Sequence, residues 1–237
     1  MIDIIIPVLN EEIILTAEAE YYKTLRQFSK IIFVDGGSTD KTVDIAKEFG
    51  IVISSPAGRA IQKNYGFQNT AAEHVLFLHV DTFINKNALE QIEKSLDNGA
   101  VGGCLTMRIE NKGLMFRLYE IIVNFRSTSF GIIDGDLGTF VRRDVFEQLG
   151  GFDLHPVMED IIFSKKLHEA GPICVLQEPI CVSSRKWHNN GFIKTFFEYT
   201  LAYTRLWTGR IKPSESYEEY CQTKYTAQYD GAHHFCP

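Results

Sequence analysis

An apolar run meets a carboxylate in the stretch Val75-Leu76-Phe77-Leu78-His79-Val80-Asp81-Thr82. A continuous apolar run of this kind is typical of a strand that is buried on both faces of a parallel sheet. The polar end of such a strand lies at the carboxyl edge of the sheet, where open α/β folds bind their ligands. The stretch therefore predicts that Asp81 lies at the mouth of a nucleotide crevice.

Predicted strands and helices alternate along the first part of the chain. They lie at residues 2–6, 11–28, 30–34, 41–48, 51–53, 60–72 and 75–80. Strands joined in this way by helices pair in parallel through right-handed crossovers. The order predicts an α/β fold with a Rossmann-like, mostly parallel central sheet flanked by helices.

The second half is predicted to be less regular. Its elements are a helix at 86–97, a strand at 101–109, an apolar helix at 114–125, a loop at 127–137, a strand at 138–141, helices at 143–149 and 159–170, strands at 173–176 and 180–183, and an aromatic helix at 192–208. The polar tail at 213–237 is predicted to be loosely ordered.

The composition narrows the class of protein. The 237 residues carry 24 basic and 30 acidic side chains, which argues against nucleic acid as the main partner because duplex binding depends on clustered Lys and Arg. The five cysteines show no C-x-x-C spacing and predict reduced intracellular thiols. A strand at residues 2–6 leaves no room for a signal peptide, and no apolar run is long enough to span a bilayer. We therefore expect a cytoplasmic protein.

Polar residues follow the first, second and fourth predicted strands. The carboxyl ends of parallel strands meet at one edge of a sheet, so Asn10, Glu12, Asp35 and Asp81 are expected to border one crevice. Asp35 can accept hydrogen bonds from a base or a ribose. Each residue also has a structural explanation, for example Asn10 as a turn former and Glu12 as an acid in the first turn of a helix.

The segment Gly58 to Gly66 opens a predicted helix. Free N–H groups at a helix start suit phosphate, and Arg59 and Lys63 add positive charge. The alternative is a capped surface helix with ordinary basic residues. The chain has no G-x-G-x-x-G after its first strand and no Walker lysine loop. The lack of both motifs argues against a dinucleotide dehydrogenase and against a P-loop ATPase.

Two later segments also carry polar groups. Glu159 and Asp160 lie where a loop enters a helix, and they are either functional or only complementary to the helix dipole. The segment from Ser183 to His188 combines two cations, an indole and an imidazole. Such a loop suits a diphosphate and a sugar ring. Alternatively, Trp187 fills an interface and His188 is a surface histidine.

Taken in order, these segments resemble the family 2 glycosyltransferases, which are inverting enzymes of the GT-A fold. The matching segments are Ile5-Ile6-Pro7-Val8-Leu9-Asn10-Glu11, Val34-Asp35-Gly36-Gly37-Ser38-Thr39-Asp40, Gly58 to Gly66, Phe77 to Asp81, Gly138 to Phe152, Glu159-Asp160 and Arg185-Lys186-Trp187. The resemblance implies one GT-A domain at 1–212. Its nucleotide-sugar-binding half is 1–99, and its acceptor and catalytic half is 100–212, with a C-terminal extension on the acceptor side.

The resemblance implies a role for each matching residue. The catalytic pair would be Asp160, as general base, and Glu159. The donor nucleotide would be bound by Pro7, Asn10, Glu12, Asp35, Arg59, Lys63 and Asp81. The acceptor and the diphosphate would be bound by Asp136, Arg185, Lys186 and Trp187.

The resemblance also implies a divalent metal, Mn²⁺ or Mg²⁺, on Asp81, which matches the last residue of the family's Asp-x-Asp motif. His79 stands in place of the first aspartate. Either an imidazole, that of His79 or His188, completes the coordination, or Asp81 holds the metal with water and phosphate alone. Ser183 and Lys186 replace the Gln and Arg of the longer family motif, which weakens any inference of a processive polymerase. The pattern is similar to a small bacterial branch, some members of which are linked to arsenosugar biosynthesis.

The predicted reaction moves a sugar from a UDP- or GDP-sugar to a sugar, small-molecule or lipid-linked acceptor. The alternatives are a non-catalytic nucleotide-sugar-binding module and a sugar nucleotidyltransferase. The second would need a glycine-rich loop, and residues 7–12 contain no glycine. Six basic residues and one acidic residue at 185–212 are interleaved with aromatic side chains. This pattern suits either peripheral contact with the inner face of a membrane or packing in the core or a homodimer interface, and packing is favoured.

Overall fold

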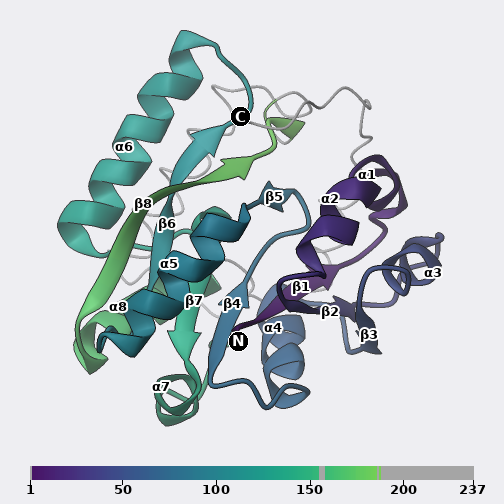
Figure 1. Ribbon diagram of the computed structural model, residues 1–237, viewed down its shortest axis with the longest axis horizontal. Coiled ribbons are helices and arrows are strands. Elements are labelled where there is room, and N and C mark those ends of the chain that lie inside the picture. The colour runs from purple at the N-terminus through teal and green to yellow at the C-terminus, as the bar shows by residue number, and fades with distance from the viewer. Residues whose placement is uncertain (1, 155–157, 186, 188–237) are drawn as a thin grey trace.

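The first half of the chain builds parallel strands around β1. The computed structural model describes residues 2–154, 158–185 and 187 (Figure 1). β1 (Ile2–Val8) lies between β2 (Lys30–Asp35) and β4 (His74–Phe77), and β3 (Ile51–Ser54) pairs with β2, always in parallel. Ile4, Ile5 and Ile6 are buried, as expected for a strand covered on both faces.

The second half adds strands of mixed direction to the same sheet. β7 (Thr139–Arg142) is antiparallel to both β4 and β6 (Gly102–Ile109), whereas β8 (Ile173–Val182) is parallel to β6. The short β5 (Thr82–Phe83) is antiparallel to β8. Within the described residues the order is β3-β2-β1-β4-β7-β6-β8-β5. The predicted α/β sheet is confirmed, but the sequence did not predict its antiparallel part.

Helices flank this sheet. They are α1 (Glu12–Ala17), α2 (Ala19–Leu25), α3 (Thr42–Ala46), α4 (Arg59–Gln68), α5 (Lys86–Asp97), α6 (Leu114–Phe130), α7 (Arg143–Gln148) and α8 (Glu159–Ala170), with a 3₁₀ turn at Gly135–Leu137. α4 packs on β1 and β2, while α5 packs on β8 and β7. Figure 1 shows α6 at the outer edge of the molecule, beside β6.

Several predicted boundaries differ from the structure. The helix expected at 11–28 breaks at Glu18, which leaves helical geometry (φ −101°, ψ 22°). α6 runs on to Phe130, so the loop predicted at 127–137 begins too early. The strands predicted at 173–176 and 180–183 form one strand, β8, with an irregularity opposite Leu105 and Thr106. A bulge of this kind accommodates Pro179, which lacks the N–H that a regular ladder needs.

The opening stretch also ends as a strand sooner than predicted. β4 stops at Phe77, although the backbone N–H of Leu78 still donates to the carbonyl of Ile5. The chain then turns because the Thr82 hydroxyl accepts from the N–H of His79 and donates to its carbonyl. Asp81 therefore lies in a tight turn beyond the strand end, rather than directly on the strand.

Two expectations about the chain's environment can be compared with the structure. Cys104 and Cys174 are free, as predicted, whereas Cys181 is disulfide-bonded, so the prediction of reduced thiols is wrong for Cys181. Sequence spacing cannot reveal which thiols approach each other in space. No helix of the described residues has both the length and the hydropathy to cross a bilayer. The predicted helix at 192–208 and the tail at 213–237 lie outside the described residues.

Gly103 tests the close contact of β6 with its neighbours. A β-carbon at this position would lie 1.8 Å from the carbonyl oxygen of Cys174 and 2.7 Å from the Phe140 ring. We expect Gly103→Ala to lower the free energy of unfolding by about 2 kcal/mol or more, because backbone must move to relieve the overlap. Urea unfolding measures the loss. The control is Gly113→Ala, where the nearest atom is a movable Asn111 side-chain oxygen; equal losses in both variants would contradict the close contact.

Candidate active site

The loop after β2 is held against the loop after β1. The Asp35 carboxylate accepts hydrogen bonds from the backbone N–H groups of Gly37 and Ser38 at 3.0 and 3.1 Å. Asn10 Oδ1 accepts from the N–H of Thr39 at 2.8 Å, with Asn10 in the left-handed region at φ 54°. Asn10 and Asp35 thus shape one polar rim at the carboxyl edge of the sheet, as the sequence predicted.

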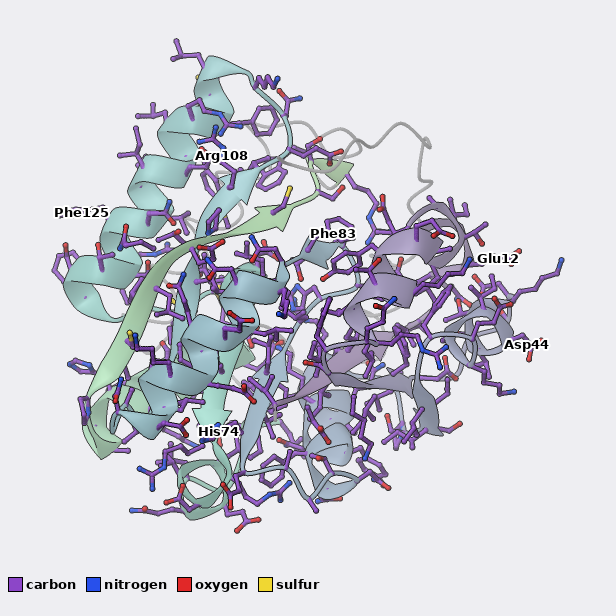
Figure 2. All side chains as sticks on the ribbon, viewed as in Figure 1. Glu12, Asp44, His74, Phe83, Arg108 and Phe125 are labelled. Carbon is purple, nitrogen blue, oxygen red and sulfur yellow. The ribbon has the colours of Figure 1, made fainter. Side chains whose placement is uncertain are left out.

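Glu12 strengthens the same rim. Its carboxylate accepts from the N–H of Lys41 at 3.0 Å, while its own N–H donates to Asp40 at 3.2 Å. Figure 2 labels Glu12 at the start of α1, where the residue is half-buried. Pro7 lies in β1 opposite Val34 of β2. In this structure Glu12 therefore holds the rim together, and contact with a ligand stays a prediction.

A guanidinium joins the chain segments that follow β1 and β4. Arg185 follows β8 and donates to Glu11 at 2.8 and 3.4 Å and to Asp81 at 3.2 Å. Burial raises the pKa of Glu11, and the charge and hydrogen bonds of Arg185 oppose that rise. Because Arg185 makes two bonds to Glu11 and one to Asp81, Asp81 is the partner that Arg185 can leave more readily. The sequence analysis missed Glu11, although it stands between the two residues that were chosen, Asn10 and Glu12.

Lys63 lies between two carboxylates at the start of α8. Its Nζ atom is 3.2 Å from Glu159 Oε1 and 2.5 Å from Asp160 Oδ1. Arg59 pairs with the other oxygen of Glu159 at 3.1 Å, and Lys63 also lies 4.8 Å from the centre of the Phe152 ring. Lys63 is only 1% exposed. Lys63 was predicted to bind donor phosphate, but here it neutralises charges inside the protein.

Burial and charge shift the two carboxyl groups in opposite directions. Burial raises the pKa of Glu159, but the cations Arg59 and Lys63 outweigh it and hold that pKa below its usual value. Burial also raises the pKa of Asp160, and with the nearby charge of Glu159 it outweighs the effect of Lys63. Asp160 is therefore the more basic of the two groups.

The imidazole of His79 lies close to Asp160. Its Nδ1 atom is 3.1 Å from Asp136 Oδ1, and its buried Nε2 atom has no hydrogen-bond partner among the described residues. A β-carbon on Gly135 would lie 2.3 Å from Asp160 Oδ2 and 2.9 Å from His79 Nε2. The absence of a β-carbon at Gly135 thus lets the imidazole and Asp160 Oδ2, the oxygen that does not contact Lys63, lie close to the Gly135 backbone.

Trp187 packs against α6. It is buried, and its ring packs edge-on against Phe116 and Tyr119 of α6 with centroid distances of 5.6 and 5.7 Å. The indole is therefore a packing group in this structure, and its predicted contact with the acceptor stays a prediction. Lys186 and His188 lie outside the described residues.

Comparison with known proteins decides the family. Residues 3–150 match the sequence profile of glycosyl transferase family 2. The chain belongs to this family. Poly-beta-1,6-N-acetyl-D-glucosamine synthase of Staphylococcus epidermidis is 28% identical over 160 residues, which cover 59% of this chain and 38% of the synthase. The chain therefore spans well under half the length of that relative.

Solved structures agree on the fold. S. aureus TarS 1-349 in complex with UDP-GlcNAc matches with a TM-score of 0.60 and 20% identity, over 78% of this chain and 58% of the TarS 1-349 chain. The mannosyltransferase PcManGT of Pyrobaculum calidifontis, in complex with GDP-Man and Mn²⁺, matches with a TM-score of 0.60 and 18% identity, over 84% of this chain and 64% of that one. This family 2 chain thus has the predicted GT-A fold.

The divalent metal implied by family 2 membership can be tested against the side chains. The described residues contain no group of three His, Cys, Asp or Glu side chains able to hold a metal. Asp81 offers one partly exposed carboxylate, and Nδ1 of His79 is engaged by Asp136. Magnesium sites often combine one or two carboxylates with substrate phosphates and water. The residues therefore fit a metal that arrives with a diphosphate, and Asp81 would be its protein ligand.

The family 2 site shows where sequence reasoning succeeded. It predicted that Asn10, Asp35 and Asp81 share one edge of the sheet, and the structure brings these loops there. It did not predict that Arg185 bridges to Glu11 or that Lys63 pairs with Asp160. A signal existed for Lys63, since a lysine on the buried side of an amphipathic helix needs an acidic partner.

Replacing Lys63 tests the buried pair. We expect Lys63→Met to lower the free energy of unfolding by about 3–5 kcal/mol at neutral pH, because two buried carboxylates would lose a shared counter-charge. The lowered pKa of Glu159 means that its stabilising contribution is present above the usual carboxyl pKa and is lost as the pH falls through the lowered value. Without Lys63 that pKa rises, so the deficit of the variant should shrink in acid.

Urea unfolding at neutral and mildly acidic pH measures this deficit. The control is Lys166→Met, which removes a more exposed ion pair with Asp153 and should cost less than about 1 kcal/mol. If Lys63→Met were as stable as Lys166→Met at neutral pH, the proposed role of the buried ammonium would be wrong.

Proposed function

We propose that this chain transfers a sugar from a nucleotide-diphosphate sugar to an acceptor hydroxyl with inversion, and that Asp160 is the general base. The observation that carries the proposal is the position of Asp160. One of its oxygens is fixed by Lys63, and the other lies close to the Gly135 backbone, near the His79 imidazole. A carboxylate that is held in place, with a raised pKa, suits proton removal near neutral pH.

The reaction needs one concerted exchange of bonds. The acceptor oxygen bonds to the anomeric carbon as the bond from that carbon to the diphosphate oxygen breaks on the opposite face. Asp160 takes the proton of the acceptor hydroxyl. General-base catalysis of this kind typically raises the rate by about 10²–10⁴-fold. Glu159 acts as a positioning residue, because it shares Lys63 with Asp160 and is itself buried.

The donor would lie along the rim and the Arg185 bridge. Asp35 and Asn10 border the position proposed for the nucleoside. The guanidinium of Arg185, once it leaves Asp81, can turn to the diphosphate while Glu11 still holds it. A metal bound with the diphosphate on Asp81 would act as a Lewis acid for the departing charge. The ligands of TarS and PcManGT, UDP-GlcNAc and GDP-Man with Mn²⁺, support a donor of this class.

Asp160→Asn separates chemistry from binding. We expect donor affinity to be retained and turnover to fall by about 10²–10⁴-fold, because the amide keeps the shape of the side chain but cannot take a proton. A thermal-shift screen first identifies the donor by comparing UDP, GDP, UDP-sugars and GDP-sugars, each with Mn²⁺. Calorimetry and donor hydrolysis or transfer are then measured. Asp153→Asn, at an exposed carboxylate, is the control. Near-normal turnover of Asp160→Asn would rule out Asp160 as the base, and no turnover by the wild type would favour a binding module.

Asp81→Ala tests the metal-linked part of donor binding. We expect the gain in nucleotide affinity on adding Mn²⁺ to fall by about tenfold or more, because the protein ligand to the metal is removed. Titration calorimetry of UDP and GDP, with and without Mn²⁺, measures this gain. Asp44→Ala, on an exposed carboxylate of α3 labelled in Figure 2, is the control. An unchanged response to Mn²⁺ in Asp81→Ala would exclude Asp81 as the ligand.

A further inference from the structure

The polar and apolar faces of α6 are partly inverted: Val123 is buried and Phe116 and Tyr119 pack against the core, but most of the large apolar side chains face outward. A surface helix of a globular protein normally turns its apolar stripe to the core. In α6 the side chains of Glu120, Asn124 and Ser127 face inward or are partly buried, whereas large apolar side chains face outward. Such an inversion needs a cause on the inner side and a partner on the outer side.

The cause on the inner side is the open edge of β6. β6 pairs with β7 only at Gly102 and Gly103, so the same edge is unpaired farther along. Asn124 accepts from the N–H of Met107 at 2.6 Å and donates to its carbonyl at 3.0 Å. Glu120 accepts from the N–H of Ile109. These side chains take the place of a neighbouring strand, which satisfies the buried backbone groups.

The outer side of α6 is an exposed apolar stripe. The stripe consists of Leu114, Met115, Leu118, Ile121, Ile122 and Phe125, whose exposed fractions range from 44% to 83%. At about 100° per residue these six positions fall within one arc of about 120°. Figure 2 shows Phe125 on the outer side of the helix, away from the sheet. No other element of the described residues exposes as many large apolar side chains.

The exposed charged side chains next to the stripe are basic. Glu120 is the sole acidic residue between residues 111 and 130, and it is buried against Arg117 at 2.8 Å. Arg126 pairs with Asp134. Arg108 and Lys112, just before the helix, are exposed, whereas Glu110 between them is half-buried. An apolar stripe with cations at one end and no exposed acid is complementary to a surface that is apolar inside and anionic at its rim.

We propose that α6 rests on the surface of an anionic lipid bilayer. Interfacial helices lie in the membrane plane, with apolar side chains at the acyl boundary and basic side chains among the headgroups. The stripe covers residues 114–125 of α6, so it is about 18 Å long and one helix wide. That strip is narrow for a stable dimer, which buries about 800 Å² on each partner. The inference does not depend on the proposed catalytic reaction.

Flotation of the full chain with vesicles tests the proposal. Vesicles of phosphatidylcholine with phosphatidylglycerol are compared with vesicles of phosphatidylcholine alone. We expect the protein to float with the anionic vesicles, and less so as salt is raised. The double variant Ile121→Glu, Phe125→Glu should lose about tenfold or more in partition. Ile51→Glu, which places the same charge at an exposed site on β3, should partition like the wild type.

Four results would overturn the proposal. The first is no flotation with anionic vesicles, and the second is equal flotation of the wild type and the double variant. The third is a dimer, seen by light scattering, that only the double variant dissociates, since the stripe would then meet a second copy. Melting temperatures complete the test. A much larger fall in melting temperature for the double variant than for Ile51→Glu would mean that another part of the chain covers the stripe. That result also contradicts the proposal. Unchanged nucleotide binding by the double variant keeps this result separate from the catalytic proposal.

Discussion

The buried ammonium of Lys63 is the contact on which the arrangement of the candidate site depends. Lys63 belongs to α4, which packs on the parallel strands, and its partners Glu159 and Asp160 open α8 in the second half of the chain. Removing one partner from a buried ion cluster is far more costly than losing a surface pair. The same contact therefore joins the two halves and fixes the carboxylate proposed as the base.

A second ionic contact acts at the crevice in a different way. Arg185 links Glu11, after β1, to Asp81, after β4, and it comes from the end of β8. Three strand ends are tied by one guanidinium, which is partly exposed rather than sealed in the core. In the proposed reaction, such a partly exposed pair would exchange partners with the diphosphate of the donor, whereas the buried Lys63 cluster would stay in place. The site thus combines a rigid part around Asp160 with an adaptable part around Asp81.

Much of the first half could be predicted from sequence because its signals are local. The apolar runs of β1, β2 and β4 and the polar residues after them place Asn10, Asp35 and Asp81 on one edge without any knowledge of distant contacts. The second half is different. β7 joins β4 in the antiparallel direction, and α6 turns its polar side to β6. Both features depend on pairing between distant segments, so periodicity along the chain could not reveal them.

The sequence by itself determined the α/β class, the family resemblance and the strand-end positions of the candidate donor site, because each follows from short patterns of apolar, polar and glycine residues. The tertiary structure alone decided the partners of the charged groups. Lys63 could have bound phosphate, but its burial requires carboxylates. Asp81 could have stood at a strand end by itself, yet it meets Arg185 from 104 residues away. Charge pairing acts through space, and only the packed fold decides which charges lie close together.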